Sequence, residues 1–158
     1  MTARSKFWDM IEDTDVCMMV SQGADGLHAR PMYAIVERDD RQLWFFTRLD
    51  SGKSEELQQD GEVCLCFAAP RQSDFVSVTG KAALVQDRER VDRYWSRFVD
   101  AWFPEGKDSD VVGLIRVDVS RGEYWDGESS NMLAALKMLR ASQKDETPDL
   151  GENRKVSL

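Results

Sequence analysis

The sequence predicts a mostly β fold, an antiparallel barrel of about six strands with helices on its outside. Short apolar runs rich in β-branched and aromatic residues recur along the chain, and turn-forming residues separate most of them. Apolar residues at helical spacing occupy only a few short segments beside these runs. With 158 residues, 42% of them hydrophobic, the chain is long enough for one domain with a buried core.

The first predicted element is a short helix from about Arg4 to Asp13. Phe7, Met10 and Ile11 fall on one face of this segment, between acidic positions. We therefore expect a helix that covers the core with one face and meets water with the other.

Three strands are predicted to follow this helix. Val16 to Val20 is apolar, Gly23 to Gly26 is a turn signal, and Ala29 to Val36 resumes an extended pattern, so these residues predict a hairpin. Asp39-Asp40 supplies another turn before the apolar run Leu43 to Thr47. The third strand is therefore expected to follow the hairpin directly.

The middle of the chain combines the start of a helix with two further strands. Ser51 to Leu57 has a hydroxyl followed by acidic residues, which is typical of a helix start, and such an end attracts anions. Val63 to Ala68 and Phe75 to Val85 have strand character. Gly80 interrupts the longer strand, where a bulge or bend would let the sheet curve and close.

The last third of the chain predicts two helices around further strands. Asp87 to Val99 carries large apolar residues at helical spacing, whereas Val111 to Val119 and the pair Tyr124-Trp125 return to strand character. Asn131 to Arg140 has its leucines on one side and predicts the last helix.

Domain organisation follows from composition. Residues 1–141 are predicted to form a single domain. Residues 142–158 are polar and charged and include Pro148 and Gly151, so we expect a flexible C-terminal tail that buries too little apolar surface to become ordered.

Charge and residue counts exclude several classes of function. A formal charge of −8 argues against nucleic-acid binding, which needs a basic face. His28 is the single histidine, so a metal site built from several imidazoles is excluded, and we predict no metal. Cys17, Cys64 and Cys66 are expected to be reduced core residues, the last two on one face of a strand. No apolar run is long enough for a membrane span or signal peptide, which favours the cytoplasm.

Several short motifs in a fixed order, between about Phe7 and Asp126, carry a family resemblance. They are His28-Ala29-Arg30-Pro31-Met32, Leu43-Trp44-Phe45-Phe46-Thr47 followed by Ser51 and Lys53, Val76 to Ala82, Trp102 to Gly106, and Tyr124-Trp125. Together they resemble the split-barrel flavoproteins related to pyridoxamine 5'-phosphate oxidase, in particular the bacterial general stress protein branch. The resemblance implies a homodimer of six-stranded antiparallel split β-barrels, with FMN in the groove between the subunits.

The resemblance also implies where the phosphate of FMN binds. Phe46 and Thr47 would lie near the ribityl-phosphate, and the turn from Ser51 to Lys53 would bind the phosphate itself. A phosphate dianion needs a cation and several short donors, which Lys53, Ser51 and Thr47 supply. From the residues alone, a solvated lysine near a helix start is the favoured interpretation of Lys53, and the family resemblance reverses that preference.

Around the flavin ring, the resemblance implies that Arg30, Pro31 and Met32 run beside it. Arg30 would donate to the ring region where negative charge gathers on reduction, although an exposed, ion-paired arginine on an edge strand has the same sequence pattern. Trp125 would stack near the ring or shape the substrate pocket from the partner subunit. Trp102, like the other large aromatic residues, is expected in the core or an interface.

The sequence departs from the oxidase that makes pyridoxal phosphate. The phosphate turn has one lysine, Lys53, and the C-terminal residues contain no histidine, so we do not expect oxidation of pyridoxamine phosphate. Two functions remain, an FMN-dependent oxidoreductase with a small-molecule electron donor and acceptor, and a stress protein that binds or sequesters flavin without turnover. Haem binding would depend on His28 alone. No catalytic residue is identified by the sequence.

Overall fold

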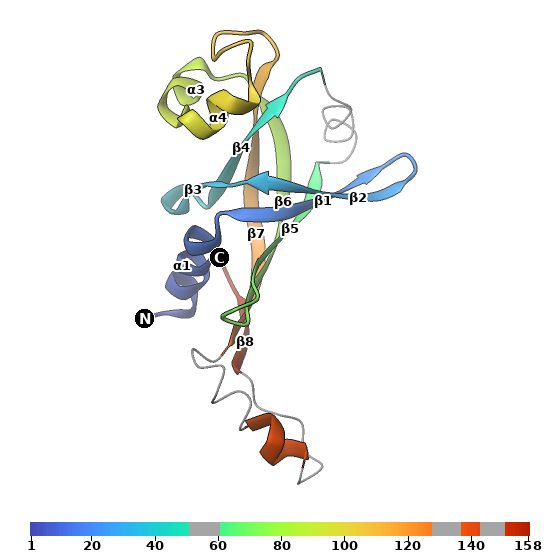
Figure 1. Cartoon of the computed structure of the whole chain (residues 1–158), viewed down its shortest axis with the longest axis vertical. Coiled ribbons are helices and arrows are strands. Elements are labelled where there is room, and N and C mark those ends of the chain that lie inside the picture. The colour runs from blue at the N-terminus through green and yellow to red at the C-terminus, as the bar shows by residue number, and fades with distance from the viewer. Residues whose placement is uncertain (51–60, 128–136, 143–150) are drawn as a thin grey trace.

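An eight-stranded antiparallel sheet forms the body of the chain, and helices lie against it at two places (Figure 1). The structure is a computed structural model that describes residues 1–50, 61–127, 137–142 and 151–158. The strand order is β2-β1-β5-β6-β7-β4-β3, and β8 pairs with β7. The strands are β1 (Val16–Gly23), β2 (Gly26–Tyr33), β3 (Ile35–Glu37), β4 (Gln42–Arg48), β5 (Glu62–Ala69), β6 (Asp74–Val85), β7 (Val112–Gly127) and β8 (Gly151–Val156).

The sheet curls round into a split barrel. Strands β2 and β3 stand at opposite ends of the strand order, yet only Ala34 separates them in the chain, so the two ends of the sheet must meet. Strand β7 joins both parts, because its first half pairs with β4 and its second half with β8. The predicted mostly β barrel with flanking helices is confirmed. The predicted count of six strands is exceeded because β3 is separate from β2 and the C-terminal residues add β8.

Two backbone features expected from glycines are present. The β1–β2 hairpin turns at Gly23 to Gly26, where Gly26 has a φ of 123°, a conformation that favours glycine. The pairing of β6 with β7 shifts register between Thr79 and Gly80, which is the predicted irregularity in the long strand. A Cβ atom at Gly80 would lie 2.5 Å from the backbone oxygen of Asp118, so this position has no room for a side chain.

We expect Gly80→Ala to lower the free energy of unfolding by about 1–3 kcal/mol, because the backbone of β7 would have to move. Gly113→Ala is the matched control, since an added Cβ there meets the flexible side chain of Leu49, 2.5 Å away. Urea unfolding of both variants measures the difference. Equal losses in the two variants would show that the close approach of β6 and β7 is not rigid.

Helix α1 (Ala3–Thr14) closes one side of the barrel, as predicted. The hydroxyl of Thr2 accepts a hydrogen bond from the amide of Ser5 at 3.0 Å and caps the helix. Phe7 and Ile11 are fully buried in the main core, together with Trp8. The helix therefore stabilises the barrel by burying its apolar face.

Helices α3 (Arg88–Tyr94) and α4 (Arg97–Trp102) form a second layer over β4. The single helix predicted from residue 87 to residue 99 is therefore two helices. The chain breaks at Trp95 and Ser96, and the hydroxyl of Ser96 caps α4 by accepting a hydrogen bond from Val99 at 3.2 Å. This break turns the face of α4 relative to α3.

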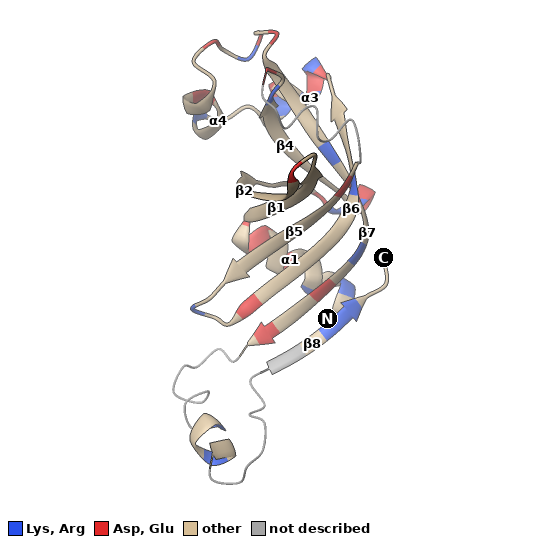
Figure 2. Cartoon of the chain, turned by 90° about the vertical axis from the view of Figure 1, so that its right-hand side faces the viewer, with Lys and Arg blue, Asp and Glu red and all other residues tan. Residues whose placement is uncertain are grey.

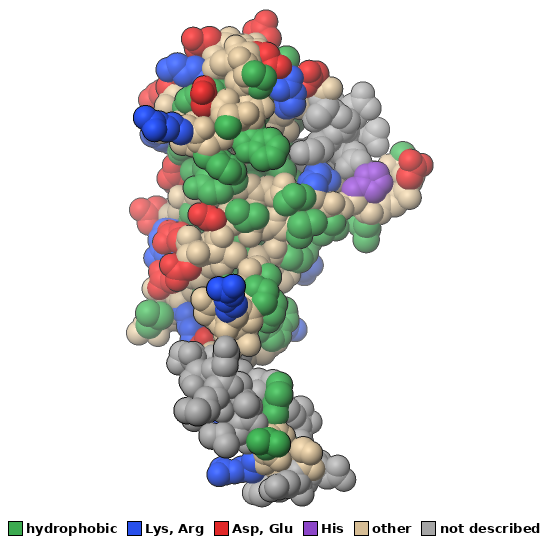
Figure 3. Space-filling model, viewed as in Figure 1, with side chains coloured by type: hydrophobic (Ala, Val, Ile, Leu, Met, Phe, Trp, Pro, Cys, Tyr) green, Lys and Arg blue, Asp and Glu red, His purple; other side chains and the backbone are tan. Residues whose placement is uncertain are grey.

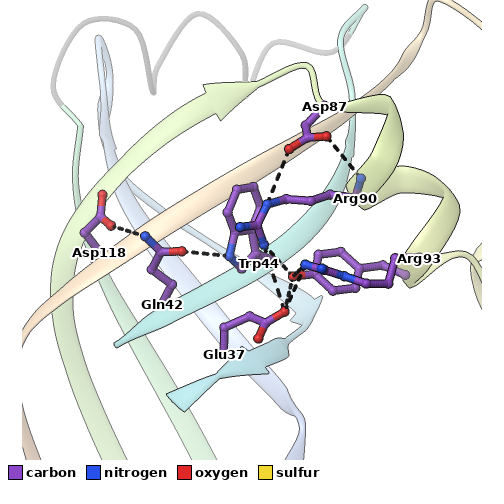
Figure 4. Close-up of polar contacts among 8 residues, drawn as sticks. Glu37, Gln42, Trp44, Asp87, Arg90, Arg93 and Asp118 are labelled. Atoms are coloured by element: carbon purple, nitrogen blue, oxygen red, sulfur yellow. Dashed lines mark hydrogen bonds and ion pairs between the residues drawn. The ribbon is translucent and has the colours of Figure 1, made fainter. Parts of the chain in front are cut away.

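A polar network attaches α3 to the sheet (Figure 4). The guanidinium of Arg90 lies 4.2 Å from the ring centroid of Trp44 on β4, and its Nη1 is 3.9 Å from a carboxylate oxygen of Glu37. The indole of Trp44 donates to Gln42 at 3.2 Å, and Gln42 donates to Asp118 at 3.0 Å. These contacts fix the helical layer over β4.

The cysteines divide between the inner and outer faces of the sheet. Cys17 is buried in the core, as predicted, and burial raises the pKa of its thiol to about 12. Cys64 and Cys66 share one face of β5, also as predicted, with their sulfurs 3.8 Å apart. This is the outer face, where Cys66 is exposed and Cys64 is half-buried, so the prediction of a core position is wrong for both residues.

The C-terminal end of the chain forms a strand beside β7 (Figure 2). Strand β8 pairs with the second half of β7, and Val156 is buried in the main core. The prediction of a flexible tail is therefore wrong for 151–156, because pairing along an available strand edge orders a segment with few apolar side chains. Residues 137–142 are helical, in agreement with the end of the last predicted helix, whereas 128–136 and 143–150 lie outside the described residues.

Among the residues described, no helix is both long enough and apolar enough to cross a bilayer.

Candidate functional site

A cavity of about 510 Å³ opens where the end of β4 meets β2 and α4. Its volume lies within the range of small-molecule binding sites. Figure 3 shows hydrophobic side chains gathered between the lobe of α3 and α4 and the β1–β2 hairpin. The lining residues are Val16, Pro31, Met32, Tyr33, Phe46, Thr47, Arg48, Phe98, Val99, Trp102 and Phe103.

Strand β4 gives the cavity two different sides, because successive side chains of a strand point to opposite faces. Thr47 shares a face with Phe45, which is buried in the main core. Phe46 and Arg48 share the opposite face, and Phe46 packs against the core beneath α3 and α4. We call the part lined by Pro31, Met32 and Thr47 the Thr47 side, and the part lined by Phe46, Arg48, Phe98, Trp102 and Phe103 the α4 side.

On the Thr47 side, one buried hydroxyl makes no hydrogen bond to a described residue. Thr47 is 3% exposed, and its Oγ1 is buried without a hydrogen-bond partner among the residues that the structure describes. An unsatisfied buried hydroxyl is unfavourable by about 1–3 kcal/mol. A polar group of a bound molecule would remove this penalty.

On the α4 side, the charge of Arg48 is matched by two carboxylates. Its Nη2 donates to Glu105 Oε1 at 2.6 Å, its Nη1 to Glu105 Oε2 at 3.2 Å, and its Nε to Asp50 Oδ1 at 3.1 Å. The guanidinium beside Glu105 holds the pKa of that carboxyl below its ordinary value, so Glu105 is ionised at neutral pH. Among the residues that the structure describes here, two carboxylates therefore pair with the one guanidinium of Arg48.

Aromatic rings form the remaining wall of the α4 side. Phe98 and Trp102 stand on one face of α4 with their ring centroids 6.4 Å apart, and Tyr33 of β2 lies 5.3 Å from Phe98. Phe98 is 54% exposed and Trp102 is 67% exposed. Of the two positions expected for Trp102, the core of the single chain is wrong, since its ring lines the cavity and faces solvent. A position in an interface stays a prediction.

The structure brings four of the predicted site residues to the cavity, namely Pro31, Met32, Phe46 and Thr47. Arg30 lies beside it on β2 and donates from Nη1 to the hydroxyl of Ser21 at 2.8 Å. Trp125 is at the other end of the sheet, paired with Phe75, and does not line the cavity of one chain. Ser51 and Lys53 lie outside the described residues.

Other cavity residues were not predicted from the sequence. Val16, Tyr33, Arg48, Phe98 and Val99 line the site although no motif singled them out. The available signal was the segment from Trp102 to Gly106, which follows α4 directly. This segment meets β4 only because the helices pack on the sheet. Residue spacing along the chain does not reveal that packing, so the contact could not be predicted.

Comparison with known proteins identifies the family. Residues 2–149 match the family described as pyridoxamine 5'-phosphate oxidase like, and the chain belongs to this family. The fold is shared with a provisionally named general stress protein 26 from Jannaschia sp. CCS1, with a TM-score of 0.77 and 26% identity over 98% of this chain and 97% of that chain. A general stress FMN/FAD binding protein from Xanthomonas citri gives a TM-score of 0.72 and 32% identity over 80% of this chain and 90% of that chain.

A curated relative is also similar over part of its length. Protein bli-3 of Neurospora crassa is 30% identical over 99 residues, which are 58% of this chain and 47% of that protein. The chain thus spans about half the length of this relative.

Proposed function

We propose that this protein binds FMN in the cavity at the end of β4 and serves as a flavin-dependent oxidoreductase of the general stress type. The observation that carries the proposal is the buried hydroxyl of Thr47, a residue that lines a mostly apolar cavity of suitable size. The Xanthomonas citri relative, which is named for FMN/FAD binding, supports the same ligand class.

The cavity residues fit such a ligand. Pro31 and Met32 line the cavity with apolar side chains that suit the ring, and we propose that Thr47 offers its hydroxyl to the ribityl-phosphate. The chain runs from Arg48 at the end of β4 directly toward Ser51 and Lys53, which we propose as the phosphate ligands. Bound FMN would supply the electron transfer, while the protein's own residues bind it, orient it and keep water away.

We also propose a cytoplasmic homodimer in which the outer face of the sheet is the interface. Cross-strand register places Val16 opposite Tyr33, Met18 opposite Cys66, and Phe75 opposite Trp125, all on this face. The apolar residues of this face are each 37% to 47% exposed, which favours their burial against a partner subunit. Val16 and Tyr33 also line the cavity, so a second copy seated here would close it. The apolar members are Val16, Met18, Tyr33, Phe75 and Trp125.

We expect Met18→Arg to convert the dimer into monomers, because it places a charge opposite Cys66 in the proposed interface. Leu139→Arg is the control, since it adds the same charge at an exposed apolar residue of the helical segment 137–142. Sedimentation velocity of both variants and circular dichroism of their folds test the interface. A Met18→Arg variant that remains a dimer would place the interface elsewhere.

The absorption spectrum of the purified protein tests the function as a whole. We expect bound FMN that NADH, NADPH or another small-molecule donor reduces anaerobically, and that an added acceptor reoxidises. Bound flavin that no donor reduces would identify the alternative function, flavin binding without turnover. Failure to bind FMN after reconstitution would contradict both.

A further inference from the structure

The α4 side of the cavity has the features of a second ligand site. Phe98 and Trp102 present exposed ring surface from one face of α4, and Phe103 is buried in the core between the helices and β4. Exposed aromatic surface beside a cavity favours a flat ring, because stacked and edge-to-face arrangements of aromatic rings are attractive. This surface lies across β4 from Thr47, so a ring bound here does not compete for that hydroxyl.

Charge at this side selects the kind of ring. Arg48 is the cation that lines the described part of the cavity, and Glu105 and Asp50 both pair with it. An anion approaching Arg48 would have to displace a carboxylate and would meet the second one. An uncharged ring meets no such penalty.

We infer that the α4 side binds an uncharged planar aromatic compound and rejects an anionic compound of the same shape, with Trp102 as the stacking residue and Glu105 as the selecting residue. A quinone belongs to the accepted class, and a pyridine phosphate to the rejected class. The inference rests on the proposed function only in naming this compound as the small-molecule partner of the flavin.

Calorimetric titration with two matched probes tests the inference. 2-Naphthamide is uncharged and 2-naphthoate is its anionic counterpart of nearly equal shape. We expect 2-naphthamide to bind the protein about tenfold more tightly than 2-naphthoate, both with and without FMN. Similar affinities for the two probes, or tighter binding of 2-naphthoate, would overturn the inference.

Three variants separate stacking from charge. Trp102→Ala should weaken 2-naphthamide roughly five- to tenfold, whereas Trp102→Phe should restore most of the affinity. Glu105→Gln should strengthen 2-naphthoate on the order of threefold and leave 2-naphthamide unchanged. Asp108→Asn removes an exposed carboxylate from the same loop and should change neither. A Trp102→Ala variant with native affinity would overturn the assignment of the stacking residue.

A separate titration with FMN distinguishes failure of this inference from failure of the proposed function. Protein that binds FMN but does not discriminate between the two probes contradicts only the inference. Protein that discriminates between the probes but does not bind FMN supports the inference and contradicts the proposed cofactor.

Discussion

Lys53→Ala is expected to weaken FMN binding by about 1.5–3 kcal/mol, because a charge-assisted contact to the phosphate is lost. The affinity for riboflavin, which lacks the phosphate, should stay nearly constant. Lys53 is expected to matter because the other cation at the cavity is already paired. Arg48, which lines the described part of the cavity, pairs with Glu105 and Asp50. We therefore expect the phosphate to find its positive charge in the residues that follow β4.

Fluorescence titration of both flavins measures this effect directly. Lys107→Ala is the control, because it removes a lysine from the loop that carries Glu105 without altering the segment after β4. Equal losses of FMN and riboflavin affinity in Lys53→Ala would show that Lys53 supports the local structure and does not bind the phosphate. An unchanged FMN affinity would move the phosphate site elsewhere.

Local patterns were sufficient to predict most of the fold. Alternating apolar residues and turn signals predicted the β1–β2 hairpin and strand β4 close to their observed bounds. Gly80 predicted the irregularity in β6. The backbones of β6 and β7 approach so closely at this position that only glycine fits, and the glycine is visible in the sequence. Patterns of this kind report local geometry, which is why they were reliable.

The errors arose where distant residues decide the structure. Strand β8 has few apolar side chains, and it is ordered by backbone pairing with β7, which composition does not reveal. The division between α3 and α4 is the exception, because it follows from the local cap at Ser96, although the apolar residues keep helical spacing across it. Cys66 lies on the outer face because the position of β5 within the sheet decides which face is covered.

The candidate site was predicted in part for the same reason. Pro31, Met32, Phe46 and Thr47 were predicted through a family resemblance in neighbouring strands, and they line one cavity. The α4 side was missed because its residues come together only when the helical layer packs on β4. Opposed charges at Arg48 and Glu105, 57 positions apart in the chain, are likewise a property of the folded protein.

Thr47→Val is expected to have opposite effects on stability and on binding. Valine keeps the shape of threonine but replaces the buried Oγ1, which has no partner in the described part of the chain, by a methyl group. Removing an unsatisfied polar group should stabilise the FMN-free protein by about 1 kcal/mol. Removing a hydrogen bond to the ligand should weaken FMN binding by about 1–2 kcal/mol.

The two effects share one cause, since the hydroxyl is unfavourable in the empty cavity and favourable against the ligand. Thr14→Val provides the contrast, because the hydroxyl of Thr14 already donates to the backbone oxygen of Met10 at 2.9 Å and its loss should not stabilise the protein. Thermal unfolding without FMN and titration with FMN measure the two effects separately. A Thr47→Val variant that is less stable, or that binds FMN as tightly as the native protein, would show that this hydroxyl serves the fold and not the ligand.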